Sequence, residues 1–313
     1  MAEMVVKATR ESFGEALCEL AKTNKDIVVL DADLAAATKT SIFQKAYPER
    51  FFDCGIAEGN MIGVAAGLAA SGKIPFAASF AMFATGRAFE QIRNSVAYPK
   101  LNVKIAGSHA GISTGEDGAT HQCLEDIAIM RAIPNMTVIN PADHYEMLGA
   151  VKAALELDGP VYIRLGRLAI PSVNNNDDYK FELGKGVTLR EGNDVTIIAT
   201  GLVVREAVLA ADSLKEQGIN ARVVNIHTIK PIDEDIIVKA AKETGRIITF
   251  EEHNVIGGLG DAVISVVSEK CPVPVKECGV QDRFGYSGPA KELLEIFGFT
   301  APGIEKEVKS FIG

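Results

Sequence analysis

The chain has 313 residues, 47% of them hydrophobic, and a formal net charge of −9 at pH 7. A single hydrophobic core stops growing at roughly 250–300 residues, so this length predicts two domains. The negative charge argues against non-specific nucleic-acid binding, which requires a basic face. No apolar run is long enough to span a bilayer, and the N-terminus does not resemble a signal peptide. We therefore expect neither nucleic acid nor a membrane among the partners.

Five cysteines are scattered along the chain, and none of them belongs to a CxxC pair. An odd number of widely spaced cysteines is typical of reduced thiols, rather than of a disulfide framework or a zinc site. We therefore expect a cytoplasmic protein with free thiols at Cys18, Cys54, Cys123, Cys271 and Cys278.

The first half of the chain alternates between helix and strand patterns. Apolar residues recur at helical spacing over 7–24, and residues 27–34 form an apolar run that ends in acidic residues, as a buried parallel strand does. The alternation then predicts helices at 60–71, 86–97, 124–132 and 141–156, and strands at 74–80, 103–107, 136–140 and 160–167. Such an alternation indicates a mostly parallel sheet covered on both faces.

Residues 171–185 interrupt this alternation with a proline, three asparagines and two aspartates, which is typical of an exposed linker. A second block follows, with strands predicted at 195–201, 222–231 and 246–253 and helices near 203–217, 233–242, 258–268 and 287–297. We therefore expect two consecutive three-layer α/β/α domains with mostly parallel sheets. Their predicted bounds are 1–170 and 188–313, with a linker at 171–187.

Glu58 lies where a short apolar run, FFDCGIA, gives way to the small apolar pattern of a buried helix, NMIGVAAGLAASG. A helix N-terminus stabilises a carboxylate, whereas apolar neighbours such as Ile56 and Met61 exclude water and raise its pKa. A carboxyl group under these opposing influences is a candidate proton donor and acceptor. The alternative interpretation of this stretch is a glutamate that only caps the helix.

The loop SHAGISTGEDGATHQ, from Ser108 to Gln122, is rich in glycine and carries two histidines and two acidic residues. Glycines let the backbone approach a ligand closely, and His109 and His121 can each exchange a proton near neutral pH. With Asp117 between them, they suit a polyhydroxylated or carbonyl substrate. The spacing is not that of a known zinc site, and the loop lacks both GxGxxG and GxxxxGK[ST], so we predict neither a metal nor a nucleotide.

Further candidates lie at the ends of predicted elements. Phe80 and Phe83 are at the carboxyl end of a strand, where a planar heterocycle can stack on them, with core packing as the alternative. Asp33 follows another strand at the edge where ligands gather in parallel sheets, with a turn aspartate as the alternative. Arg10 begins a helix, where a cation opposes the helix dipole, so we expect it to have another partner.

Several motifs, in this order, resemble the carboxyl-terminal half of transketolase. They are GIAEGNM, SFAMF, SHAGISTGEDGATHQ, VINPADHYE and IRLGR, followed by TIKPID, EEHNVIGGLGDAV and FGYSGPAKELLEIFG. In that family this half comprises a pyrimidine-binding domain and a small carboxyl-terminal domain. The resemblance covers essentially the whole chain but only half of a full-length transketolase.

The resemblance implies a role for each matching residue on the cofactor side. Glu58 matches the glutamate that hydrogen-bonds the aminopyrimidine of thiamine diphosphate and activates this cofactor. Phe80 and Phe83 match aromatic residues that pack on the pyrimidine ring, and Asp33 matches an aspartate near the cofactor.

On the substrate side, His109, Asp117 and His121 match residues that contact the sugar hydroxyls and the reacting carbonyl. Arg10 and Arg167 match arginines that hold the substrate phosphate, which suits a planar cation. The implied catalytic set is Glu58, His109 and His121.

The chain departs from the family pattern in three places. Gly59 stands where the family commonly has His or Gln. The third aromatic residue that often follows Phe83 is absent, and the spacing around Gly86 is longer than in several relatives. An expected phosphate-binding serine falls near Ala37, where Thr38 would have to replace it.

Enzymes of this kind hold the cofactor diphosphate and its metal with a GDG…N motif on a separate domain, and this chain contains no GDG. The resemblance therefore implies the second subunit of a split transketolase, which transfers a two-carbon ketol unit between sugar phosphates in the pentose phosphate pathway. We expect an amino-terminal partner subunit that carries GDG…N and holds Mg²⁺ or Ca²⁺. We also expect a heterotetramer with two copies of each chain, and no activity without the partner.

Three other interpretations stay open. A 1-deoxyxylulose-5-phosphate synthase and the β subunit of a 2-oxoacid dehydrogenase share the glutamate and the fold. However, the synthase is usually one long chain, and the β subunit usually lacks GEDGxTHQ. A non-catalytic scaffold subunit is the third, although a decayed site would have lost some of the residues that are all present here.

Overall fold

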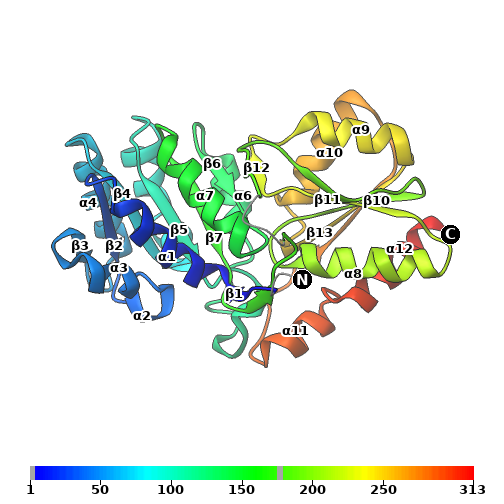
Figure 1. Ribbon diagram of the computed structural model, residues 1–313, viewed down its shortest axis with the longest axis horizontal. Coiled ribbons are helices and arrows are strands. Elements are labelled where there is room, and N and C mark those ends of the chain that lie inside the picture. The colour runs from blue at the N-terminus through cyan, green and yellow to red at the C-terminus, as the bar shows by residue number, and fades with distance from the viewer. Residues whose placement is uncertain (1–3, 175–178) are drawn as a thin grey trace.

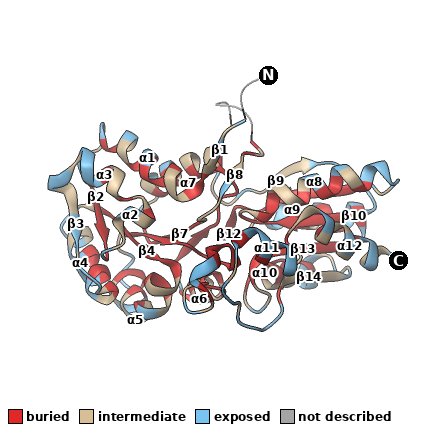
Figure 2. Ribbon diagram, turned by 90° about the horizontal axis from the view of Figure 1, so that it is seen from below, coloured by how far each residue is buried: buried red, intermediate tan, exposed pale blue. Residues whose placement is uncertain are grey.

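The computed structural model describes residues 4–174 and 179–313, which form two α/β domains lying side by side (Figure 1). Residues 175–178 of the predicted linker lie outside the described residues. The strands at the centre of both domains are buried, and exposed residues gather in loops and on outer helix faces (Figure 2). The predicted fold class, two α/β domains with mostly parallel sheets, is confirmed.

The first domain is built on a seven-stranded sheet in the order β12-β6-β7-β5-β4-β2-β3. Neighbouring strands are parallel except at one edge, where β12 is antiparallel to β6. The strands are β2 (Ile27–Asp31), β3 (Phe51–Asp53), β4 (Ile74–Phe80), β5 (Lys104–Ser108), β6 (Thr137–Ile139), β7 (Val161–Leu165) and β12 (Thr228–Lys230).

Helices cover both faces of this sheet, because its central strands are apolar on both sides. Along β2, Ile27 and Val29 pack against one helical layer, whereas Val28 and Leu30 pack against the other. The first layer contains α1 (Thr9–Ala21), α3 (Ser41–Ala46) and α7 (His144–Glu156). The second contains α4 (Glu58–Ala70), the π-helices η2 (Met82–Arg87) and η3 (Ile92–Ala97), and α6 (Asp126–Ala132). Shorter helices connect these elements: α2 (Ala35–Thr38), η1 (Pro48–Arg50), α5 (Phe89–Gln91) and η4 (Ile112–Asp117).

The second domain has a five-stranded sheet in the order β14-β13-β10-β11-β9, with β9 antiparallel and the other strands parallel. Its strands are β9 (Val187–Arg190), β10 (Val195–Ala199), β11 (Ala221–Asn225), β13 (Ile247–Asn254) and β14 (Val275–Val280). Helices α8 (Val203–Glu216) and α12 (Ala301–Ile312) pack on one face, and α9 (Glu234–Thr244) and α10 (Leu259–Lys270) on the other. Helix α11 (Ala290–Ile296) follows the last strand. A separate antiparallel pair, β1 (Val6–Ala8) and β8 (Ala169–Pro171), joins the start of the chain to the segment after β7.

The strand predicted at 222–231 divides between the two sheets. Strand β11 stays in the second sheet, and β12 then adds to the β6 edge of the first sheet. At the crossing the Asn140 N–H donates to the carbonyl of His227 at 2.8 Å. The second domain thus covers an edge of the first sheet that would otherwise present unpaired backbone groups.

The helix predicted at 86–97 begins earlier, at Met82, and its longer parts are the π-helices η2 and η3. A π-bulge accommodates an extra residue within a helix. The longer spacing around Gly86 falls inside η2, so the helix absorbs it there. The short elements α2, α3 and β3 have only three to six residues each, and so show no periodicity that would predict them.

Both described ends of the 171–187 segment are held by buried carboxylates of the first domain. Asp143 caps α7 by accepting from the Glu146 N–H at 2.9 Å, and its second oxygen accepts from the Val173 and Asn174 N–H groups. The Tyr179 hydroxyl donates to Glu146 at 2.7 Å. Burial raises the pKa of Glu146 to about 7. These bonds fasten the segment to the first domain on both sides of residues 175–178.

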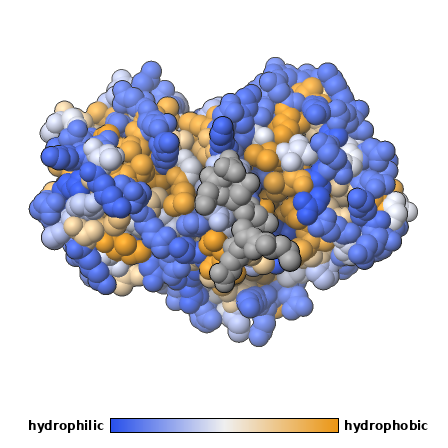
Figure 3. Space-filling model, in the orientation of Figure 1, coloured by the Kyte–Doolittle hydropathy of each residue, from blue (hydrophilic) through white to orange (hydrophobic). Residues whose placement is uncertain are grey.

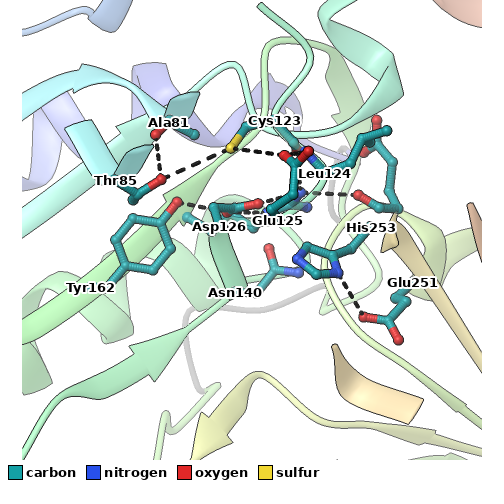
Figure 4. A network of polar contacts seen from close by, with 12 residues as sticks. Ala81, Thr85, Cys123, Leu124, Glu125, Asp126, Asn140, Tyr162, Glu251 and His253 are labelled. Atoms are coloured by element: carbon teal, nitrogen blue, oxygen red, sulfur yellow. Dashed lines mark hydrogen bonds and ion pairs between the residues drawn. The ribbon is translucent and has the colours of Figure 1, made fainter. Parts of the chain in front are cut away.

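A buried polar network lies where the domains meet (Figure 4). Asp126 accepts from Arg164 Nε at 2.7 Å, from Arg164 Nη2 at 3.1 Å and from the Tyr162 hydroxyl at 2.7 Å. Arg164 also donates to the Glu252 carbonyl of the second domain at 3.0 Å. Burial alone would raise the pKa of Asp126, but the Arg164 guanidinium outweighs it and the pKa falls below its usual value. The pair is therefore ionised and connects both sheets.

Candidate active site

The sequence-predicted site residues gather at the carboxyl edge of the first sheet. Phe80 is the last residue of β4, His109 follows β5 directly, and Arg167 comes two residues after β7. Glu58 is the first residue of α4, which follows β3. Ligands bind at this edge in open parallel sheets, because the loops and helix N-termini converge there.

Glu58 is 1% exposed and its carboxylate is paired with Arg87. Arg87 Nη1 lies 3.1 Å from Oε1 and 3.0 Å from Oε2. No side chain caps α4, so the carboxylate at its first turn also complements the positive end of the helix. Sequence reasoning missed Arg87. The two residues are 29 positions apart, and no local pattern brings η2 to the start of α4.

Four rings form a continuous aromatic cluster beside this pair. The rings of Phe80 and Phe83 stack at 5.9 Å between centroids, and the His109 ring stacks on Phe80 at 4.0 Å. His121 meets Phe83 edge-on at 5.2 Å. The Arg87 guanidinium lies over Phe83, 4.6 Å from the ring centroid. The cluster therefore runs without interruption from the Glu58–Arg87 pair to His109.

His109 is held in one tautomer by its two neighbours. Its Nε2 lies 3.2 Å from Arg10 Nη1, and its Nδ1 lies 2.9 Å from the Ser108 hydroxyl. Because a guanidinium can only donate, Nε2 is the acceptor and the proton is on Nδ1, which donates to Ser108. Burial, together with the Arg10 and Arg167 cations, lowers the pKa of His109 to about 3. The imidazole is therefore neutral across the physiological range, and its φ of 56° indicates a constrained backbone.

Arg10 and Arg167 make the region beyond His109 cationic. Arg10 Nη1 donates to the Ala37 carbonyl at 2.8 Å, which gives this cation the partner expected for its place at the start of a helix. Arg167 Nη1 donates to the Thr114 carbonyl at 2.5 Å and to Glu116 at 2.6 Å. Burial lowers the pKa of Arg10, and the Arg167 charge lowers it further. Because the positive charges of Arg10 and Arg167 repel each other, binding of an anion near both of them is favoured.

Asp33 and Asp117 are less closely tied to this cluster. Asp33 is exposed with a φ of 60°, and its N–H donates to Asp53 at 3.1 Å. Asp117 is exposed at the end of η4. Within residues 4–174 and 179–313, no hydrogen bond or ion pair joins either carboxylate to the other predicted site residues.

Asp31, rather than Asp33, is the buried aspartate at the end of β2. It accepts from the Thr38 and Thr40 hydroxyls at 2.7 and 2.8 Å, and burial raises its pKa to about 6. Thr38 therefore donates its proton inward to Asp31. The sequence signal for Asp31 is its place as the last residue of a wholly buried strand.

Two of the departures from the family pattern lie at glycines, where the structure shows which side chain is the nearest neighbour. A Cβ on Gly59 would lie 3.4 Å from Gln91 Oε1, which is an ordinary van der Waals contact. A Cβ on Gly86 would meet the Met82 methyl group, the far end of a flexible side chain that can move aside.

The described part of the chain contains no cluster of three or more His, Cys, Asp or Glu side chains arranged to hold a metal. Nor does it contain a helix with the length and apolar composition needed to cross a membrane. Hydrophilic residues cover most of the face drawn in Figure 3. All five cysteines are free thiols.

Comparison with known proteins relates this geometry to a family. Residues 6–172 match the model of the transketolase pyrimidine-binding domain, and residues 184–304 match that of the transketolase C-terminal domain. This chain belongs to the transketolase family. It corresponds to the carboxyl-terminal section of a split transketolase, as the sequence motifs predicted.

Three relatives match this transketolase chain over nearly their whole length. The transketolase C-terminal section of Methanocaldococcus jannaschii is 53% identical over 97% of this chain and 96% of its own length. The 6-deoxy-6-sulfo-D-fructose transketolase subunit of a Clostridium strain is 49% identical over 94% and 91%. A split-gene transketolase, solved as an inactive β4 tetramer, superposes with a TM-score of 0.90 at 55% identity, covering 97% of this chain and 98% of its own.

Proposed function

We propose that this chain is the carboxyl-terminal subunit of a two-chain transketolase. With thiamine diphosphate, the complete enzyme would transfer a two-carbon ketol unit from a ketose phosphate to an aldose phosphate in the pentose phosphate pathway. The observation that carries the proposal is the position of His109, stacked on Phe80 at 4.0 Å and 3.2 Å from Arg10. His109 thus lies between an aromatic surface that suits a cofactor ring and a cationic region that suits a phosphate.

The residues on the cofactor side fit the aminopyrimidine of thiamine diphosphate. This planar ring needs a hydrogen-bonding carboxylate at a ring nitrogen and an apolar surface against its face. Buried Glu58 provides the first, and Phe80 with Phe83 provides the second. When bound, thiamine diphosphate supplies the electron sink that stabilises the carbanion formed from the donor sugar. Asp33, exposed after β2, stays a candidate for a more peripheral contact.

The chain's own residues have separable roles in this proposal. Glu58 holds or returns a proton at its Oε atoms, in a site that excludes water. Neutral His109 exchanges hydrogen bonds with sugar hydroxyls at Nε2. His121 and Asp117 approach the sugar from the η4 loop. Arg10 and Arg167 orient the terminal phosphate, a task suited to planar cations.

The partner subunit would hold the diphosphate and its Mg²⁺ or Ca²⁺ through a GDG…N motif, which this chain lacks. We further propose a heterotetramer of two copies of each chain, located in the cytoplasm, as the free thiols suit. The inactive β4 tetramer of the split-gene relative supports the idea that such chains assemble alone without becoming active.

The first test of this proposal is reconstitution. We expect the isolated chain with Mg²⁺ and thiamine diphosphate to show no ketol transfer, and an amino-terminal subunit carrying GDG…N to restore it. A coupled assay with xylulose 5-phosphate and ribose 5-phosphate measures the transfer. Product formation from pyruvate and glyceraldehyde 3-phosphate instead would indicate a deoxyxylulose-phosphate synthase. Robust turnover by the isolated chain would contradict the split-subunit proposal.

Arg167→Ala tests the anion site. Hydrogen bonds to charged groups contribute about 1.5–3 kcal/mol, so we expect KM for phosphorylated donors to rise about 10- to 100-fold. The kcat should change little, because a remote clamp binds ground and transition states alike. Hydroxypyruvate, a donor without phosphate, is the control. An equal loss with both donors would assign Arg167 a structural role through Thr114 and Glu116.

The Clostridium relative acts on a sulfonated sugar by name, and a sulfonate is also an anion that Arg10 and Arg167 would bind. Phosphate is the proposed group here, since a dianion gains more from two cations than a monoanion does. Comparing kcat/KM for fructose 6-phosphate and 6-deoxy-6-sulfofructose distinguishes the two substrate classes.

A further inference from the structure

Arg87 makes two contacts with one guanidinium group. Its Nη1 bridges both oxygens of Glu58, at 3.1 and 3.0 Å, and its Cζ lies 4.6 Å from the centroid of the Phe83 ring. Neither contact belongs to a hydrophobic core, and the Arg87 side chain as a whole is 54% exposed. A planar cation is therefore held between a buried carboxylate and an aromatic ring.

These two contacts are the ones that the proposed function assigns to the aminopyrimidine ring, so the inference rests on that function. The ring needs a Glu58 oxygen and the surface of the phenylalanines. Arg87 Nη1 already lies within hydrogen-bond distance of both Glu58 oxygens, at 3.1 and 3.0 Å. The guanidinium and the pyrimidine ring would compete for the same space.

We propose that Arg87 is a placeholder, a side chain that occupies the pyrimidine site of the free subunit and leaves it when the cofactor binds. In the free chain it neutralises Glu58, since a buried carboxylate without a partner is costly. On binding, the pyrimidine takes over both the carboxylate and the ring. The arginine is thus a positioning residue that acts through Glu58.

The side chain is able to leave. Within the described residues, Nη1 is the only nitrogen of Arg87 with a hydrogen bond, so the guanidinium is held only by Glu58 and by its contact with the Phe83 ring. An exposed arginine that moves into solvent regains its hydration at little cost.

If Arg87 competes with the cofactor ring, removing its charge should strengthen cofactor binding, which a purely structural role would not do. Arg87→Met removes the charge but keeps an unbranched apolar chain against Phe83. In the free subunit Glu58 then has no cation, so we expect the Tm of the isolated chain to fall by about 1–3 °C. In the complete enzyme the cofactor no longer has to displace a guanidinium. The Kd for thiamine diphosphate should therefore fall by about three- to tenfold.

The experiment measures both quantities on the same variants. Thermal unfolding is followed on the isolated chain, and binding of thiamine diphosphate with Mg²⁺ is measured by titration calorimetry on the reconstituted pair. Arg93→Met is the matched control, because Arg93 is an exposed arginine in η3 whose side chain, within the described residues, hydrogen-bonds only to Asn94. We expect it to leave both quantities unchanged.

The outcomes distinguish a failure of the placeholder proposal from a failure of the proposed transketolase function. Lower Tm with tighter binding in Arg87→Met supports the placeholder role. Unchanged or weaker binding overturns it, and weaker binding would make Arg87 a ligand of the cofactor instead. If the wild-type pair binds no thiamine diphosphate at all, the proposed function itself fails, and the inference fails with it.

Discussion

Glu58→Gln should reduce turnover of the reconstituted enzyme by about 10²- to 10⁴-fold, the usual contribution of a general acid–base group. Glutamine keeps the shape and hydrogen-bonding capacity of the side chain but cannot exchange a proton with a ring nitrogen. The burial of Glu58, at 1% exposure, leaves no room for solvent to substitute for it. The direct measurement is hydrogen–deuterium exchange at the thiazolium C2 of bound thiamine diphosphate, followed by NMR.

Two controls separate catalysis from folding in this experiment. Cofactor binding should weaken much less than turnover, since the aromatic surface of Phe80 and Phe83 is unchanged. Loss of a helix-terminal carboxylate costs about 1 kcal/mol or less, so the variant should stay folded. C2 exchange within about threefold of wild type, small against the acid–base range, would contradict the catalytic role and leave Glu58 as a helix-terminal residue.

Asp126→Asn should lower the free energy of unfolding by about 3–5 kcal/mol, the largest stability effect that we expect from one polar substitution in this chain. Asp126 and Arg164 are fully buried and bonded through two nitrogens, at 2.7 and 3.1 Å. Removing the negative charge strands a guanidinium between the two domains. Urea unfolding of the isolated chain measures the change.

The chain contains a matched control for burial. Arg190 and Asp212 form a pair of the same bidentate geometry, at 2.7 and 2.9 Å, but their side chains are 44% and 49% exposed. Asp212→Asn should therefore cost less than about 1 kcal/mol. Equal losses at the two sites would refute the argument from burial. The double variant Asp126→Asn/Arg164→Met should recover part of the loss, because no buried charge is then left unpaired.

The sequence alone predicted the elements that have a long, regular pattern. The strand at 74–80 was predicted with the bounds that β4 has, and the helix expected near 203–217 differs from α8 by one residue at its end. Parallel strands that alternate with helices bring their carboxyl ends to one edge. The positions of Phe80 at the end of one such strand and of His109 in the loop after another were therefore predictable from the sequence, whereas Arg167 was assigned only through the family resemblance.

The family motifs identified the transketolase carboxyl-terminal half without any coordinates. The roles that they imply for the site residues all stay predictions, since the structure places these residues without testing what they bind. Glu58 was found independently of the motifs, as a carboxylate between an apolar run and the small apolar pattern of a buried helix. These are all local features, in which a residue and its immediate neighbours carry the signal.

Only the tertiary structure decided which of these residues meet, and with what partners. Arg87 reaches Glu58 across 29 positions, Arg10 reaches His109 across 99, and Asp126 reaches Arg164 across 38. The pairing of β12 with β6, which carries a segment of the second half of the chain into the first sheet, is also visible only in the tertiary structure. Side-chain periodicity reports which face of an element is buried, and it does so within a few turns or a few strand residues. It carries no information about which distant charge will neutralise a buried one, because that choice is made by the packing of whole elements against each other.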